Sequence, residues 1–273
     1  MSNLSHIMPK PVVIPILWGH DYVVNAATPP NVLQMISDLV TGPFMSGMAQ
    51  YGVQRGSVHT PIVIDDQNPP KTIVYTDTNN NLQDDITTKL IKWIDAGLVP
   101  PPPSPTDINQ LYLIIPPIES TVEKYNGQGD PTGKGVQGFH NEGVTNPAAP
   151  PIYYWAIVKT DWARPNPAQD VTPGIAPTSC HELAEQFVDR DGSYRIEVGD
   201  ACVNDQFVYR GWNVQQYTSV WDGTTCIKGN NPVSVRRFLT AIAFDSKNNG
   251  LLSLGTPTIN IDYIALKMQS FDT

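Results

Sequence analysis

Residues 179–185 read SCHELAE, and this segment decides the fold because it predicts a helix with charged residues at regular intervals. In a helix, residues four positions apart lie on the same side, so His181, Glu185 and Asp189 would point in one direction. One imidazole and two carboxylates arranged in this way can bind a single divalent cation. We therefore expect a metal site on this helix.

The same segment is similar to a catalytic pattern, with one change. Metalloproteases with an HExxH motif bind zinc through two histidines four positions apart and use the glutamate as a general base. Here Glu185 stands where the second histidine would be, and Glu182 stands where the base would be. A second interpretation needs no metal, because Ser179 and Glu182 have the spacing of a capping box that begins a helix.

Further candidate ligands lie outside this segment. His140 precedes a predicted strand, and a reversal of the chain would bring it beside the helix as a third ligand. Asp189, Glu197 and Asp200 belong to the densest acidic stretch, which could bind the metal or orient a metal-bound imidazole. The stretch does not have the spacing of an EF-hand calcium loop. Each residue also has an ordinary interpretation, as a hydrogen-bonded histidine or as part of a solvated turn.

The composition restricts the classes of partner. Of the 273 residues, 40% are hydrophobic and 16% are charged, which favours a globular chain over a disordered one. A net charge of −9 with only 17 basic residues argues against binding to nucleic acid. No apolar run approaches the length of about 18 residues that a membrane span requires. The oligomeric state does not follow from the sequence.

The three cysteines are Cys180, Cys202 and Cys226, and they allow at most one disulfide. Cys202 and Cys226 would form it if the protein is exported, whereas three reduced thiols fit a cytoplasmic protein equally well. Residues 1–10 do not have the pattern of a signal peptide. We therefore expect a cytoplasmic location.

Patterns typical of strands and helices alternate along the first two thirds of the chain. We expect strands at residues 12–18, 57–65, 72–75, 111–115 and 152–159, and helices at residues 30–40, 44–51 and 82–94. This alternation predicts an α/β fold with a mixed sheet and helices. We expect a single domain over residues 1–273. Its subregion from about residue 203 to 273 should be irregular, with short strands or helical turns at residues 217–221, 238–244 and 259–264.

These motifs, in this order, resemble the phosphate-induced protein family, also called EXORDIUM-like, with its bacterial and fungal relatives. The family motif Ser-His-Glu-(Leu/Ile)-Ala-Glu is similar to residues 179–185, a later Asp to Asp189, and Glu-(Ile/Val)-Gly-Asp-x-Cys to residues 197–202. Residues 18–19 (WG), 48–52 (MAQYG) and 138–140 (GFH) are also similar, so the likeness spans most of residues 12–226. The chain departs from the pattern at Cys180, which is inserted, and at Arg190, where a proline often stands. It also lacks the export signal of the plant members, although the resemblance leaves an extracellular location open.

The resemblance implies a zincin-like domain, in which a sheet packs against a helix that carries the metal ligands. By position, His181 and Glu185 would be ligands, His140 the third ligand and Glu182 the base. We therefore expect a zinc-dependent hydrolase of peptidase or amidase type that acts on a peptide or a small molecule. Another divalent metal is an alternative, because an anionic Glu185 makes the ion a weaker activator of water.

Two other functions remain open. The chain could be a carbohydrate-binding or cell-surface-binding protein with a structural metal site. Its stacking surface would then consist of Trp155, Trp162, Trp212, Tyr217 and Trp221, although aromatic residues more often pack in a core. It could also be a metalloenzyme of small-molecule biosynthesis, since a fold does not determine a reaction.

Overall fold

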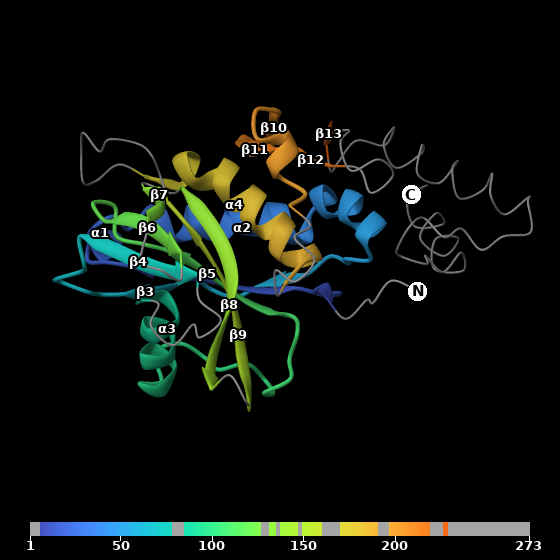
Figure 1. The fold of residues 1–273 in the computed structure, drawn as a ribbon. Coiled ribbons are helices and arrows are strands. Elements are labelled where there is room, and N and C mark those ends of the chain that lie inside the picture. The colour runs from blue at the N-terminus through green and yellow to red at the C-terminus, as the bar shows by residue number, and fades with distance from the viewer. Residues whose placement is uncertain are drawn as a thin grey trace, which may run out of the picture.

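The computed structural model describes residues 6–77, 85–126, 131–134, 137–146, 149–159, 170–190, 197–218 and 226–228 (Figure 1). Its centre is a six-stranded mixed sheet with the order β2-β1-β5-β9-β8, in which β3 also pairs with β1. The strands are β1 (Val12–Trp18), β2 (Ser57–Val58), β3 (Ile62–Ile64), β5 (Gln110–Ile115), β8 (Gly138–Asn146) and β9 (Ala149–Val158). β8 is antiparallel to β9, and the other pairs are parallel. The predicted α/β fold with a mixed sheet is therefore confirmed.

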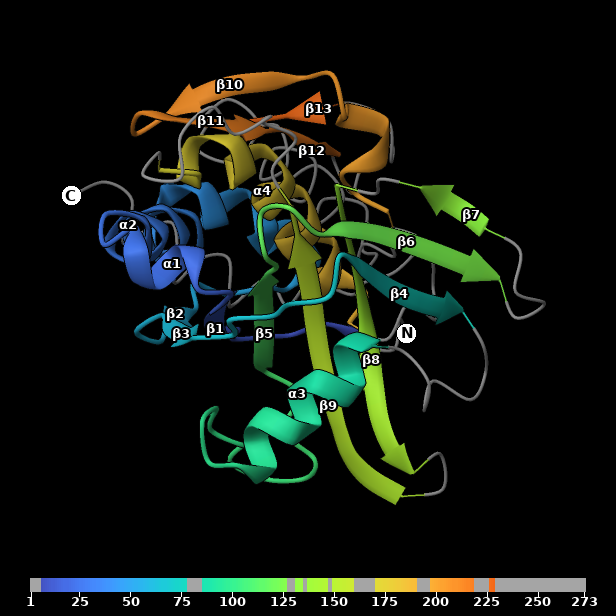
Figure 2. The same ribbon diagram turned by 90° about the vertical axis from the view of Figure 1, so that its left-hand side faces the viewer.

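Helices cover both faces of this sheet, as the two views show (Figures 1 and 2). α2 (Thr28–Thr41) and α4 (Thr172–Val188) lie on one face, and α3 (Asp85–Asp95) lies on the other. Alternate residues of each strand point to opposite faces, so Val13 of β1 packs toward α2 and α4 while Ile14 packs toward α3. Central parallel strands buried on both faces read as continuous apolar runs, which is why β1 and β5 are recognisable in the sequence.

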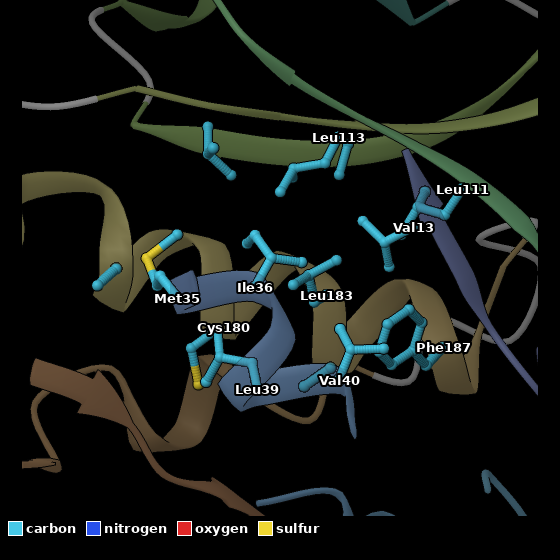
Figure 3. Packing of buried hydrophobic residues seen from close by; sticks show 14 of the residues in the cluster. Val13, Met35, Ile36, Leu39, Val40, Leu111, Leu113, Cys180, Leu183 and Phe187 are labelled. Atoms are coloured by element: carbon cyan, nitrogen blue, oxygen red, sulfur yellow. The ribbon is translucent and has the colours of Figure 1, made fainter. Parts of the chain in front are cut away.

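The core between the sheet and α4 fixes the orientation of that helix. Leu183 and Phe187 of α4 point into the same apolar layer as Ile36 and Leu39 of α2, below Leu113 of the sheet (Figure 3). All five side chains are at most 2% exposed. Because these positions of α4 are buried against α2 and the sheet, its neighbouring positions His181, Glu182 and Glu185 are turned toward other elements.

The remaining elements are short. α1 (Asp21–Val24) and the 3-10 helix η2 (Pro43–Tyr51) flank α2, and a second sheet consists of β4 (Thr72–Asp77), β6 (Thr121–Asn126) and β7 (Pro131–Lys134). After α4 come the 3-10 turn η4 (Asp200–Cys202) and two small antiparallel pairs, β10 (Gln206–Tyr209) with β11 (Trp212–Gln215) and β12 (Tyr217–Thr218) with β13 (Cys226–Ile227). A disulfide joins Cys202 to Cys226. The elements predicted at residues 238–244 and 259–264 lie outside the described residues.

The capping box predicted at Ser179 is wrong. α4 begins at Thr172, seven residues earlier, and Ser179 is buried in its interior. Proline is well tolerated in the first turn of a helix, where Pro173 lies. The Asp170 carboxylate accepts hydrogen bonds from the amide and the hydroxyl of Thr172, at 3.0 and 2.6 Å. This pairing satisfies a free amide at the start of the helix, which is what the capping box would have done.

The strand predicted over residues 57–65 is two short strands, β2 and β3, which both pair with β1. Pro61 lies between them, and proline cannot donate a hydrogen bond to a neighbouring strand.

Among the described residues, no helix combines the length and the apolar composition needed to cross a bilayer.

Candidate metal centre

The polar side of α4 faces the strands β8 and β11 and the turn η4. β8 and β11 both pack against α4, and η4 approaches it at His181. The side chains of Glu182 and Glu185 are only 5% and 2% exposed, although carboxylates seldom lie inside a protein without partners. Their partners are imidazoles that come from α4 itself and from β8.

One group of three consists of His181, Glu185 and Asp200. His181 Nε2 lies 3.1 Å from Glu185 Oε2 and 3.6 Å from Asp200 Oδ1. Ligand atoms around a tetrahedral zinc ion are about 3.3 Å apart, as zinc-to-ligand distances of about 2.0–2.1 Å require. This group could hold a metal ion.

A second group of three consists of His140, Glu182 and Glu185. His140 Nδ1 lies 3.0 Å from Glu182 Oε2 and 3.6 Å from Glu185 Oε2. This group could also hold a metal ion, and it shares Glu185 with the first group. Among the described residues, the two imidazoles do not belong to one cluster of ligand atoms within 4.8 Å of one another. The structure therefore brings His140 to the site, but beside Glu182 rather than beside His181.

Gln215 of β11 orients the His181 ring. Its side-chain amide lies 3.0–3.3 Å from His181 Nδ1, and the same amide donates to the carbonyl oxygen of Gly199 at 2.6 Å. A neutral ring whose Nδ1–H donates to Gln215 Oε1 leaves the other nitrogen, Nε2, for an ion. The thiol of Cys180 donates to the Gln215 carbonyl oxygen at 3.1 Å, which ties the backbone of β11 to α4. Nothing in the sequence pattern singles out Gln215, because its role depends on tertiary packing.

Two glycines allow the neighbouring backbone to approach the site. A Cβ atom at Gly199 would lie 2.5 Å from His181 Nδ1, and one at Gly138 would lie 2.7 Å from Glu182 Oε1. The amide of Gly199 also donates to Glu185 Oε1 at 2.9 Å, which leaves Oε2 facing both imidazoles. Close packing gives a physical reason for glycine at both positions.

The two glutamates have opposite electrostatic environments. Burial raises the pKa of Glu182, and its hydrogen bond to His140 only partly offsets that effect. Burial acts on Glu185 too, but the hydrogen bond and the charge of His181 outweigh it and lower the pKa of Glu185. Neighbouring carboxyl groups with separated pKa values can take different roles, one exchanging protons and the other staying ionised. This arrangement suits Glu182 as a base and Glu185 as a ligand.

The histidines hold protons strongly when no ion is present. Burial alone would lower the pKa of His181, but the hydrogen bond to Glu185 and the surrounding carboxylates raise it to about 9. The pKa of His140 is also raised, because its contacts with Glu182 and Glu185 outweigh its burial. A metal ion would have to displace these protons, since only a neutral imidazole binds a metal.

The two remaining predicted ligands, Glu197 and Asp189, lie in different positions relative to the site. The Glu197 residue as a whole is exposed, but the surrounding protein partly desolvates its carboxyl group. This desolvation and the negative charge of Glu185 raise the pKa of Glu197 to about 7, so its carboxyl lies near the site. Asp189 is the residue after the last turn of α4, is buried, and belongs to neither group of three. The helix ends at Val188, so the four-residue spacing that would align Asp189 with Glu185 is not continued.

The proposed aromatic stacking surface is contradicted at two of its members. Trp155 and Tyr217 are fully buried in the core, and Trp212 is partly buried with its ring nitrogen donating to Asp38 at 3.1 Å. Trp162 and Trp221 lie outside the described residues.

Comparisons of the chain with known protein families, with curated proteins and with solved structures found no match. The resemblance to the EXORDIUM-like family therefore stays a prediction, and the site rests on its own geometry.

Proposed function

We propose that this protein is a zinc-dependent hydrolase of peptidase or amidase type. The observation that carries the proposal is the contact of His181 Nε2 with Glu185 Oε2 at 3.1 Å, with Asp200 close by and a buried Glu182 next to the pair. These are the donor types that catalytic zinc binds, in the number that leaves a fourth position for water.

In this proposal His181, Glu185 and Asp200 hold the ion. When bound, zinc supplies a Lewis acid and a water molecule whose pKa is lowered to about 7. Glu182 would accept a proton from the attacking water, because its carboxylate is buried beside the ligands and burial raises its pKa above the usual value. His140 is a positioning residue, since its hydrogen bond of 3.0 Å holds the Glu182 carboxylate in place. The expected substrate is a peptide or a small amide.

The first test is metal analysis of protein purified without a polyhistidine tag and dialysed against dilute zinc. We expect about one tightly held equivalent in the wild type and less than about a tenth of an equivalent in His181→Ala. His20→Ala is the matched control, because His20 is exposed and lies outside both groups. A His181→Ala protein that holds as much tightly bound metal as the wild type would contradict the proposed ligand set.

The second test separates metal binding from chemistry. Glu182→Gln should keep the tightly held ion but lose about 10²–10⁴-fold of the hydrolysis rate on a panel of fluorogenic peptides and amides, the usual loss when a general base is removed. Equal rates in Glu182→Gln and the wild type would remove Glu182 as the base. A metal-loaded wild type that hydrolyses nothing in the panel would overturn the hydrolase proposal.

The disulfide bears on the location of the protein. Disulfides persist in oxidising compartments and are rare in the cytoplasm. The Cys202–Cys226 bond therefore supports an oxidising location over the cytoplasmic one that we expected from residues 1–10. Mass spectrometry of alkylated protein from its native source tests this point, because a cytoplasmic protein would carry alkyl groups on both cysteines.

A further inference from the structure

The group of His140, Glu182 and Glu185 binds no ion in the mechanism proposed above. Its geometry is nevertheless as suitable for an ion as that of the group of His181, Glu185 and Asp200. His140 Nδ1 lies 3.0 and 3.6 Å from its two carboxylate oxygens, compared with 3.1 and 3.6 Å for His181 Nε2 in the other group. Both sets bracket the spacing of about 3.3 Å expected around tetrahedral zinc. Its three side chains are at least nine-tenths buried, so the ligand atoms are already held in place.

The balance of charge also leaves room for a second cation. Glu182, Glu185 and Asp200 contribute three carboxylates, and in the described part of the chain their ion pairs come from His140 and His181 alone. Asp200 is 69% exposed and is screened by water, but Glu182 is only 5% exposed and is not among the ligands of the first ion. Buried charges require compensation by a partner or a metal.

We infer that the centre binds a second divalent cation through His140 Nδ1, Glu182 Oε2 and Glu185 Oε2, and that this second ion inhibits the enzyme. The inference rests on the proposed function, because inhibition follows from the loss of Glu182 as a base. A bound cation lowers the proton affinity of the whole Glu182 carboxylate, so it becomes a much weaker base toward water. Hydrolysis should therefore rise as the first ion binds and fall as the second binds.

The second ion should bind more weakly than the first. Both ions would use Glu185 Oε2, so each lowers the electron density available to the other, and their positive charges repel. We expect the two dissociation constants to differ by about tenfold or more, within the range usual for coupled sites.

The test is equilibrium dialysis of the full chain against graded zinc concentrations, followed by metal analysis. The wild type should take up two equivalents in two steps. His140→Asn should take up one, with the first dissociation constant changed less than about threefold, whereas control His20→Asn should take up two. His140→Gln provides a second variant, and circular dichroism identifies any variant that fails to fold.

The outcomes distinguish this inference from the proposed function. Saturation of the wild type at one equivalent, or a second equivalent that survives in both His140 variants, overturns the second site and leaves the hydrolase proposal intact. Two equivalents without hydrolysis overturn the hydrolase proposal and leave the second site intact. Where hydrolysis is measured, inhibition by zinc in the wild type that disappears in His140→Asn supports the inference, and equal inhibition in both overturns it.

Discussion

The ion pair between His181 and Glu185 makes the stability of the metal-free protein depend on pH. The pKa of His181 is raised to about 9, so the folded state holds the proton more strongly than the unfolded chain, whose histidine has a pKa of about 6.5. The stabilisation is fully present below pH 6.5 and is lost as the pH rises toward 9. A shift of this size corresponds to about 3 kcal/mol of unfolding free energy.

We therefore expect urea denaturation of metal-free protein to show falling stability between pH 7.5 and 9. His181→Gln should remove most of that slope, while control His20→Gln should keep it. The raised pKa of Glu197, about 7, acts mainly below this window, because its contribution is lost as the pH rises from about 4.5 to 7. Identical slopes in the wild type and His181→Gln would show that the ion pair does not carry the effect.

At the level of single residues, the sequence predicts only what is local. His181, Glu182 and Glu185 could be found because positions on one helix are related by a fixed period. Asp200 and His140 could be named as candidates, but not assigned to a partner, because their places depend on how η4 and β8 pack against α4. Gln215 was missed entirely, since an amide on a short strand has no recognisable pattern before the strand meets His181.

At the level of elements, the close contact of β8 with α4 sets the position of His140 relative to Glu182. A Cβ atom added at Gly138 would lie 2.5 Å from Thr178 Cγ2 and 2.7 Å from Glu182 Oε1. Gly138→Ala should push β8 away from the helix and lower the unfolding free energy by about 1–3 kcal/mol, the usual cost of overpacking. His140 lies two residues further along the same strand, so binding of the second ion should weaken as well.

A second substitution tests that explanation. Thr178→Ser removes the nearest clashing atom and should restore part of the lost stability in the Gly138→Ala background, as measured by urea denaturation. Thr178→Ser alone serves as the control for the change in the helix. If the two substitutions have simply additive effects, the steric contact is not the cause.

The elements also show where pattern analysis fails. The start of α4 was predicted at Ser179 because a serine three residues before a glutamate is typical of a helix start. The true start at Thr172 depends on Pro173 and on Asp170, which also accepts a hydrogen bond of 2.7 Å from Asn31 of α2. That second contact joins segments more than a hundred residues apart, and local sequence does not predict it.

At the level of the whole molecule, the Cys202–Cys226 disulfide links the turn η4, which carries Asp200, to β13. Its cysteines are 24 residues apart, and closing a loop of that length is worth about 3.5 kcal/mol in the chain-entropy treatment. The double variant Cys202→Ala/Cys226→Ala should lose about that much unfolding free energy. It should also bind the proposed first ion more weakly, because Cys202 and the candidate ligand Asp200 share the turn η4.

Thermal denaturation with and without dithiothreitol checks this expectation. The reductant should lower the melting temperature of the wild type and leave the double variant unchanged. A wild type that melts at the same temperature in both conditions would show that the bond contributes no net stability.

The predicted architecture was right where burial dictates the pattern and incomplete elsewhere. β1 and β5 lie between neighbouring strands and two helical layers, so their residues are apolar on both faces. β8 is an edge strand among the described residues, and its sequence GFHNEGVTN has no such run. The residues that approach the candidate centre from outside α4 therefore lie in the segments that hydrophobic periodicity describes least well.

The candidate ligands come from β8, α4 and η4, and these segments are more than sixty residues apart at their extremes. An unfolded chain cannot present these atoms together, so a bound cation would act only on the native state. At a free concentration one hundred times its dissociation constant, such an ion would add about 2.7 kcal/mol to the free energy of unfolding. The supply of zinc around the protein would then decide how long each molecule survives proteolysis, independently of whether any substrate is present.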